Sequence, residues 1–337
     1  MATIRDVARE ANVSIATVSN VINGSKYVSP DKTAAVRQAI DALNYNRDMS
    51  AVSLRKGTTK VIGFVGTLSE DYEFANQYFL KLIISAEAYL KQHGYSVLIS
   101  NCGEDVEQEM ASVKSFSAHR VEGMIVVPTA EEQDFVLSED IPVVFADRYP
   151  LLREKALPYD VVLSDSFESA YSMTLEQIKR GKKRFGVMNT YCKGFMNVNL
   201  RCEGLMKAVE EKGISFSDSQ IANGEWGESQ GYNICKDLFE RHPDIDSLFI
   251  TMNGLAPGAV KFLKESGRCI PEDVNVTVFD DFLWNDLVSP TITTIRQNAE
   301  EIGVKAAEAL LDRIQHRSRN SRQIMIPTKL LIRESWD

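Results

Sequence analysis

The sequence predicts an α/β protein in which a small helical head precedes a larger body with two parallel sheets. Three observations support this prediction. Apolar residues recur with a helical period through the first fifty residues, whereas short apolar runs alternate with helical segments from Lys60 onward. The chain of 337 residues also exceeds the usual size of one domain, so two or three domains are expected.

Two short helices are predicted at the N-terminus, each preceded by a hydroxyl residue that can cap its first turn. Thr3 precedes the first and Ser14 the second, with a very short turn at Asn12 and Val13 between them. The buried faces carry Ile4, Val7, Ala8 and Ala11 in the first helix, and Val18, Val21 and Ile22 in the second. Both helices are therefore amphipathic.

The second helix leaves small, hydroxyl and amide side chains on its other faces, namely Ile15, Ala16, Ser19, Asn20 and Asn23. Two helices with a very short turn and such an outer face are typical of a helix-turn-helix, whose second helix lies in the DNA major groove. The alternative is an ordinary helical hairpin with a solvated outer face. The pattern alone leaves both open.

The run from Val7 to Gly24 matches the signature VAxxAxVSxxTVSxVxNG without a gap. It resembles the DNA-binding head of the lactose-repressor/galactose-repressor family of bacterial transcription regulators. The similarity extends to the closing IRES at 332–335. It implies a homodimeric regulator, most often a repressor, that binds double-stranded DNA at a pseudo-palindromic operator and is switched by a small-molecule effector. No leucine-heptad tail closes the chain, so a dimer is expected rather than a tetramer.

Base readout is assigned to Ile15, Ala16 and Asn20, because asparagine can pair with adenine and apolar groups can contact a thymine methyl. Hydroxyl side chains nearby are candidate phosphate contacts. The full set expected at the DNA is Thr3, Ser14, Ile15, Ala16, Thr17, Ser19, Asn20, Asn23, Tyr27, Ser29, Leu54 and Arg55.

A third helix should begin at Ser29-Pro30-Asp31, which supplies a cap, a proline suited to the first turn and an acid near the positive end of the helix dipole. Its apolar stripe is Val36, Ala39, Ile40 and Leu43. The head is therefore assigned to residues 1–46. Residues 1–60 contain nine Lys/Arg and five Asp/Glu, a net charge of +4. Because the whole chain has a net charge of −9, the remaining residues carry a net charge of −13. A mildly basic head on an acidic body can still bind phosphate locally.

Residues 47–60 follow as a short helical pattern and a polar linker. A segment this short is only marginally helical alone, so a flexible linker is the alternative. The family resemblance implies a hinge helix that folds on DNA and inserts a leucine, here Leu54, into the minor groove. The chain departs from the family pattern at Arg47, where proline is usual, and at Val52, where a basic residue is usual.

The body, residues 61–337, alternates strand-like and helix-like segments, which predicts βαβ units and parallel sheets buried on both faces. The resemblance makes these the two lobes of a periplasmic-binding-protein-like core whose chain crosses between lobes three times. We expect one lobe from about 61–160 and 291–320, and the other from 161–290 and 321–337.

Few residues carry a catalytic pattern. Gly227-Glu228-Ser229-Gln230-Gly231 matches GxSxG, but no strand leads into Ser229, and a helix N-terminus is the preferred interpretation. The four histidines lack metal-ligand spacing, the five cysteines lack a CxxC pair, and no Walker or dinucleotide motif is present. No enzyme activity, cofactor or metal is therefore expected. Without a signal sequence or membrane-spanning run, a cytoplasmic protein is expected.

The carboxyl ends of parallel strands usually form the ligand site in such folds. Asp147 and Arg148 close one strand, and Asp280 closes another in the other lobe. The resemblance adds Arg201, Trp226 and Asn253 as effector residues, and Tyr78 and Phe79 lie where they could cover the ligand.

Single residues of this set could instead have structural roles: Arg201 could pair with a surface acid, and Trp226 could fill the core. Together, an aromatic face with flanking carboxylates, an amide and a guanidinium suits a polyhydroxylated ring, so a sugar or sugar derivative is the first expectation for the effector. Gly254 and Val278 depart from the family pattern here. The rival functions are a solute-binding protein or sugar sensor on the same core, and a sugar-acting enzyme.

Overall fold

The computed structural model describes residues 2–45, 58–68, 73–129, 141–150, 159–190, 196–316 and 320–336. The chain divides into two compact units, Met1–Thr59 and Lys60–Asp337, so the body begins within one residue of the predicted boundary. The hinge residues Leu54 and Arg55 lie outside the described residues.

The head contains the three predicted helices, α1 (Ile4–Glu10), α2 (Ile15–Asn23) and α3 (Pro30–Ala42). Both predicted caps form. Thr3 and Asp6 make a reciprocal capping box on α1, and the Ser14 hydroxyl accepts a hydrogen bond from the Thr17 amide at 3.1 Å. The three helices bury a small common core of Val7, Ala8, Val18, Val36 and Ala39. The helix-turn-helix geometry thus follows from local signals in the sequence.

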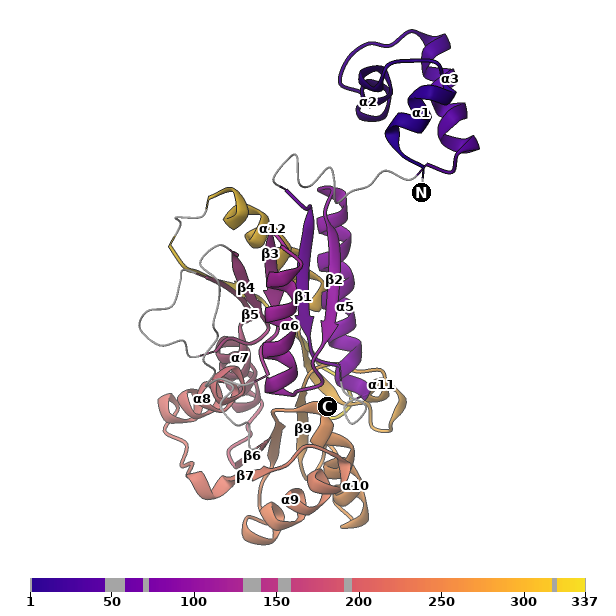
Figure 1. Cartoon of the computed structure of the whole chain (residues 1–337). Coiled ribbons are helices and arrows are strands. Elements are labelled where there is room, and N and C mark those ends of the chain that lie inside the picture. Colours follow the sequence, from indigo (N-terminus) through magenta and orange to yellow (C-terminus); the bar gives the residue numbers. More distant parts are fainter. Residues whose placement is uncertain are drawn as a thin grey trace. The chain divides into compact units, whose positions relative to one another are not determined.

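The first lobe is a six-stranded sheet of order β11-β5-β4-β3-β1-β2, and all of its described strand pairs are parallel. Helices α5 (Glu73–Gln92) and α12 (Ala299–Gln315) cover one face and α6 (Val106–Ala118) covers the other (Figure 1). The strands are β1 (Val61–Gly66), β2 (Ser96–Asn101), β3 (Gly123–Val126), β4 (Val143–Ala146), β5 (Asp160–Ser164) and β11 (Arg322–Ile326).

The second lobe repeats this design with the order β12-β10-β9-β8-β6-β7, in which only the β10–β12 pair is antiparallel. Helices α7 (Ser166–Lys179) and α8 (Met196–Glu211) pack on one face, and α9 (Glu228–Arg241) and α10 (Ala256–Glu265) on the other. The strands are β6 (Phe185–Thr190), β7 (Ile221–Gly224), β8 (Ser247–Ile250), β9 (Asn275–Phe279), β10 (Thr293–Arg296) and β12 (Lys329–Leu331), and the short helix α11 (Trp284–Leu287) follows β9.

The strand pairing has the chain crossing between the lobes three times, several residues beyond the approximate limits at 160, 290 and 320 that the sequence suggested. β5 continues in the first lobe to Ser164, β10 belongs to the second lobe, and β11 belongs to the first. Strand pairing decides these positions, since Arg322 lies opposite Asp160 and Thr293 opposite Thr277. Hydropathy along the chain does not encode that register.

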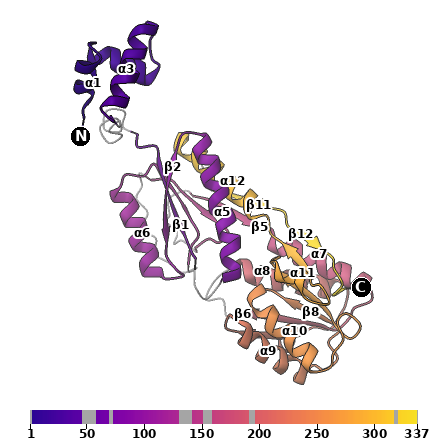
Figure 2. The same ribbon diagram turned by 90° about the vertical axis from the view of Figure 1, so that its right-hand side faces the viewer.

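Two features fix the first lobe. A Cβ added at Gly303 of α12 would lie 2.3 Å from the Leu82 carbonyl oxygen of α5, so only glycine permits this close approach. Asp160 is fully buried and accepts hydrogen bonds from Arg313 and Arg322, each at 2.6 Å. Paired burial offsets the cost of desolvating these charges. The Gly303 contact packs the first half of α12 against α5, and the Asp160 pairs hold the C-terminal end of α12 at the starts of β5 and β11; α5 and α12 lie side by side in Figure 2.

Candidate functional site

The outer face of α2 is exposed and carries the predicted base-reading residues. Ser14, Ile15 and Ala16 are exposed, and Asn20 is half-buried with its Oδ1 accepting a hydrogen bond from Ser25 at 3.0 Å. The Ile15 side chain is 46% exposed and Tyr27 is 90% exposed. Large apolar groups held in water at a helix-turn-helix are available to a partner surface.

Some predicted DNA residues also have local structural roles. Asn23 donates from its amide to the Ser19 carbonyl at 2.8 Å, which closes the last turn of α2. Thr3 donates from its hydroxyl to Asp6 at 2.7 Å. Ser29 lies at the N-cap position of α3 without a side-chain cap bond, so its hydroxyl is not committed to that helix.

In the body, two aspartates occupy equivalent places at the carboxyl ends of parallel strands, one in each lobe. Asp147 follows β4 and Asp280 follows β9. Their φ angles are 65° and 77°, a left-handed conformation that non-glycine residues rarely adopt. Such strain persists only where surrounding contacts determine it, and it concentrates at ligand sites.

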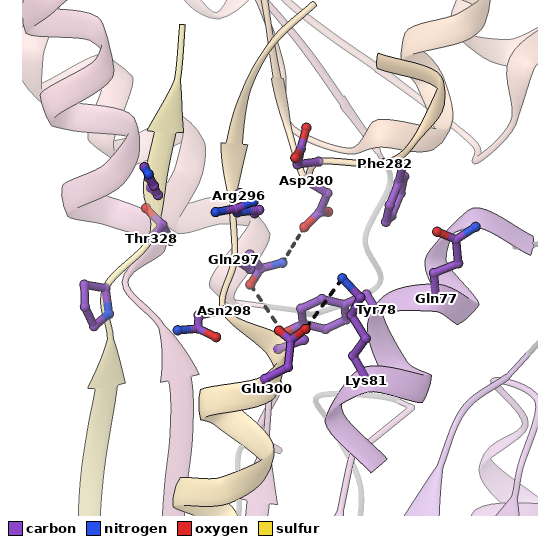
Figure 3. Close-up of a pocket in the computed structure, with 14 residues that line it drawn as sticks. Gln77, Tyr78, Lys81, Asp280, Phe282, Arg296, Gln297, Asn298, Glu300 and Thr328 are labelled. Carbon is purple, nitrogen blue, oxygen red and sulfur yellow. Dashed lines mark hydrogen bonds and ion pairs between the residues drawn. The ribbon is translucent and has the colours of Figure 1, made fainter. Parts of the chain in front are cut away.

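Hydrogen bonds link these two aspartates to neighbouring groups that nearly touch. The Tyr78 hydroxyl of α5 donates to Asp147 Oδ1 at 2.6 Å, and the Gln297 amide donates to Asp280 Oδ1 at 2.6 Å. The Tyr78 oxygen lies 3.5 Å from Gln297 Oε1 (Figure 3). Because a hydroxyl has one proton, and the shorter bond to Asp147 takes it, the Tyr78–Gln297 contact is weak.

Burial dominates the electrostatics of this cluster. It raises the pKa of Asp147 and of Asp280 above the ordinary value, and the Arg148 and Arg201 guanidinium groups respectively oppose this shift most strongly. Burial and the neighbouring Asp147 carboxylate raise the pKa of Tyr78 well above its usual value. Tyr78 is therefore a neutral donor, and a ligand donor bound at either carboxylate would relieve part of its desolvation penalty.

Arg201 of α8 is buried, which excludes the surface ion pair considered from the sequence. Its Nη1 donates to the Thr251 carbonyl at 2.6 Å, and its guanidinium stacks 3.6 Å from the centre of the Phe279 ring. Its Nε is buried without a hydrogen-bond partner. An unpaired buried donor beside two carboxylates is costly and is the kind of group that a ligand oxygen satisfies.

Arg148 makes two ionic contacts, one of them with Asp147. Its Nη1 lies 2.9 Å from Glu104, and its Nε lies 3.6 Å from Asp147. Glu104 was not among the predicted site residues. Glu104 holds Arg148 beside Asp147, so the positive charge of Arg148 acts on the Asp147 carboxylate.

Two of the predicted effector residues have structural roles. Asn253 is 1% exposed, donates to the Asp280 carbonyl at 2.8 Å and accepts from the Trp284 indole at 2.7 Å. It therefore positions Asp280. Phe79 is buried in the hydrophobic core of the first lobe, because its face of α5 is the one that packs on the sheet.

Trp226 is half-buried, and its indole packs against Gly254. A Cβ at position 254 would lie 2.3 Å from the Trp226 ring. The departure from the family pattern at Gly254 is thereby explained, since any larger residue would push the indole away. The Trp226 side chain is therefore partly accessible, rather than wholly buried like a core residue.

A pocket of about 380 Å³ lies where α5 faces the two crossovers that follow β10 and β11. In Figure 3, Gln77, Tyr78 and Lys81 form one wall, and Arg296, Gln297, Asn298 and Thr328 form the opposite wall. Tyr78 and Asp280 are the predicted effector residues that line it. Gln297, Arg296 and Lys329 were missed, although the β-branched run at 291–295 indicates a strand that would place them at a sheet edge.

The catalytic motif considered in the sequence has a plain structural role. Ser229 lies in the first turn of α9, as predicted. His242 is hydrogen-bonded to the Ser219 carbonyl at 3.0 Å, and His316 to Asp312 at 3.0 Å. Cys102, Cys202, Cys235 and Cys269 are free thiols. Within the described part of the chain, no helix is both long and apolar enough to cross a bilayer.

Two family models match the chain. Residues 3–48 match "Bacterial regulatory proteins, lacI family", and residues 59–334 match "Periplasmic binding proteins and sugar binding domain of LacI family". Similar curated proteins include the HTH-type transcriptional repressor PurR of Haemophilus influenzae (strain PittEE), 34% identical over 99% of this chain and 98% of its own length. PurR of Klebsiella pneumoniae (strain 342) is 32% identical over 99% and 97%.

Solved structures share the fold. The lac repressor dimer bound to operator and the anti-inducer ONPF superposes with a TM-score of 0.84 at 22% identity, covering 99% of this chain and 98% of that one. The transcriptional regulator CelR–cellobiose complex gives a TM-score of 0.73 at 25% identity, covering 99% and 100%.

Proposed function

The chain belongs to the LacI family of bacterial regulatory proteins, a family of transcriptional regulators, and from this premise we propose how its own residues read DNA and sense a ligand. It is a DNA-binding repressor with an effector-binding core. The observation that carries this conclusion is the joining of the exposed α2 face to a two-lobed core in one chain. A solute-binding protein that does not regulate genes does not need a DNA-binding head.

We propose that Ile15, Ala16 and Asn20 read base edges in the major groove. Support comes from their position on the exposed side of α2, opposite the buried Val18. The hydroxyls of Ser14, Thr17, Ser19 and Ser29, with Thr3, Asn23, Tyr27 and Arg55, are proposed to hold the DNA backbone. Two heads of a dimer then bind a pseudo-palindromic operator, and Leu54 is proposed to enter the minor groove between half-sites.

The proposed effector is a sugar or sugar derivative. Asp147, Asp280 and the unpaired Nε of Arg201 would bond its hydroxyls, and the indole face of Trp226 would stack on its C–H side. The description of the matching core family as a sugar-binding domain and the cellobiose bound to a similar regulator support this class. Tyr78 is proposed to line the same cleft, and Arg148 to act through Asp147.

The proposed switch is a population shift between lobe angles. Tyr78 donates a hydrogen bond to one oxygen of Asp147, and Gln297 donates one to an oxygen of Asp280. A weak contact between Tyr78 and Gln297 connects these two hydrogen-bonded pairs. Effector hydroxyls compete for these oxygens and thereby favour another lobe angle. Effector binding then changes operator affinity by coupling, and the same coupling changes effector affinity when DNA binds.

Dimerisation is supported by apolar side chains exposed on one side of the body. Ile84 of α5 is 63% exposed and Leu287 of α11 is 74% exposed. Both helices lie on the same side in the two ribbon views (Figures 1 and 2). Leu80 is also exposed, one turn before Ile84 on the same side of α5, and Leu283 is exposed immediately before α11. A dimer partner that contacts both lobes would respond to a change in the angle between them.

We place the protein in the cytoplasm, where its DNA target lies, and assign it no catalytic activity, because the family that it matches consists of transcriptional regulators. A thermal-shift screen against sugars, nucleosides and their phosphates, followed by operator titrations with each hit, tests the proposal. A hit that raises the melting temperature and changes operator affinity supports it. Turnover of a bound sugar, or no preference for any DNA sequence in a selection from random duplexes, would overturn it.

A further inference from the structure

Two cations oppose each other at the edge of the 380 Å³ pocket. Arg296 on β10 and Lys329 on β12 are direct partners in the antiparallel register, and both line the pocket. Both side chains are exposed, and neither has a carboxylate partner among the residues that the structure describes. Like charges directly opposite each other on paired strands destabilise a sheet.

The acids of the pocket do not neutralise this pair, because each already has a partner. Asp281 lies 2.9 Å from Arg333, Glu300 lies 3.6 Å from Lys81, and Asp280 accepts from Gln297. Among the described residues, Arg296 and Lys329 are therefore cations of the pocket without an ion-pair partner.

We propose that this pocket holds a second ligand subsite, which borders the sugar cleft at Tyr78 and Asp280 and takes a small phosphate monoester between Arg296 and Lys329. A phosphate monoester carries close to two negative charges at neutral pH and so matches the two cations. The planar guanidinium of Arg296 can bond two phosphate oxygens, while Lys329 supplies a point charge. The volume is in the range of small-molecule pockets, which leaves room for the group that bears the phosphate.

The walls give this site a route to the switch. Arg296 and Lys329 belong to the second lobe, whereas Gln77 and Lys81 on the facing wall belong to α5 of the first. A ligand held by the cations and reaching the facing wall spans both lobes next to Gln297. It would stabilise the lobe angle in which the two walls have this separation.

Inorganic phosphate is the probe, titrated into the full-length protein at pH 7.5 and constant ionic strength with chloride as the balancing anion. The melting temperature should rise in a saturable way, by about 2–4 °C near ten times the dissociation constant. Lys329→Glu should abolish the rise, and Arg296→Gln should weaken it. Without phosphate, Lys329→Glu should itself melt up to about 2 °C higher than wild type, because an opposed ion pair replaces two like charges.

Lys264→Glu, at an exposed lysine of α10 in the same lobe and outside the pocket, is the matched control and should retain the full response. A response that is absent from wild type, or unchanged in both Lys329→Glu and Arg296→Gln, would overturn the proposal; in the second case phosphate binds elsewhere, such as the head. Phosphorus NMR line broadening gives an independent reading of binding for each variant. No DNA enters the assay, so its failure leaves the proposed repressor function intact.

Discussion

The head carries its candidate recognition groups on an exposed surface, whereas the body carries them in a sheltered site. In the head, Ile15 and Tyr27 are exposed and the polar side chains bond within a few residues of themselves. In the body, Asp147, Asp280 and Arg201 are sheltered and depend on residues distant in sequence. DNA is a long charged polymer and binds to an open surface. A small ligand is enclosed in a pocket, where each of its hydroxyls needs a hydrogen-bond partner.

This contrast is tested most strongly by removing a sheltered group. Asp280→Ala should weaken affinity for the effector found in the screen by about 1.5–3 kcal/mol, because bonds to a buried carboxylate exceed ordinary hydrogen bonds. Calorimetric titration measures the loss. Operator affinity without effector should stay within about twofold of wild type. Equal effector affinity in both proteins would remove Asp280 from the site.

Leu54→Ala should separate the two units functionally. Operator affinity should fall by about 1.5–3 kcal/mol, the value of one buried leucine side chain, because the proposed minor-groove wedge is lost. Effector affinity in the absence of DNA should not change. Fluorescence anisotropy with labelled operator measures the first quantity and calorimetry the second; unchanged anisotropy would reject the hinge role.

Asn20→Ala should cost about 1–3 kcal/mol of operator affinity and relax the preference at one base pair per half-site. The selected wild-type operators should carry A·T there, since asparagine pairs with adenine. Thr33→Ser, at the inner side of α3, serves as a control that leaves the DNA surface untouched. Selected sites invariant for G·C at that position would contradict the assignment.

The pH dependence of stability should reveal the sheltered carboxyl group. Because burial raises the pKa of Asp280, the folded state favours its protonated form. Its contribution to stability is therefore complete below the unfolded pKa near 4 and is lost as pH rises through the folded pKa. Asp280→Asn should consequently melt higher than wild type at pH 8, with the gap narrowing toward pH 4. A gap independent of pH would contradict the raised pKa.

The head should show the opposite sign and a smaller effect. Hydrogen bonds from Thr3 lower the pKa of Asp6, so its contribution is present above about pH 4 and is lost as pH falls. Asp6→Asn should slightly increase amide exchange in α1 at pH 7. At pH 2 the variant and wild type should exchange alike. An equal difference at both values would show that the carboxylate charge plays no part in the cap.

The sequence predicted the head well because its signals are local. The Thr3 and Ser14 caps, the Val18 stripe and the exposed Ile15 all lie within a few residues of one another. The parallel sheets followed equally from alternation. The placement of Asp147 and Asp280 at strand ends in opposite lobes was also predicted, because a strand end is visible as the end of an apolar run.

The rest depended on register between distant segments. Gln297 bonds a residue seventeen positions away, but its neighbour Tyr78 is 219 positions away. The pairing of Arg296 with Lys329 exists only because β10 and β12 are adjacent, and β12 was not predicted. Asn253 and Phe79 were predicted at the effector, and the structure adds that Asn253 donates to the Asp280 carbonyl and that Phe79 packs in the core; residue type alone does not reveal these partners.

The central claim is that a ligand bound in the body changes how tightly the head holds its operator. Operator titrations with wild-type protein, with and without a saturating concentration of the effector found in the screen, test it most directly. The account predicts a change in the dissociation constant of about fivefold or more, and a much smaller change with Asp280→Ala at the same effector concentration. Identical operator affinity with and without a ligand that demonstrably occupies the cleft would contradict it.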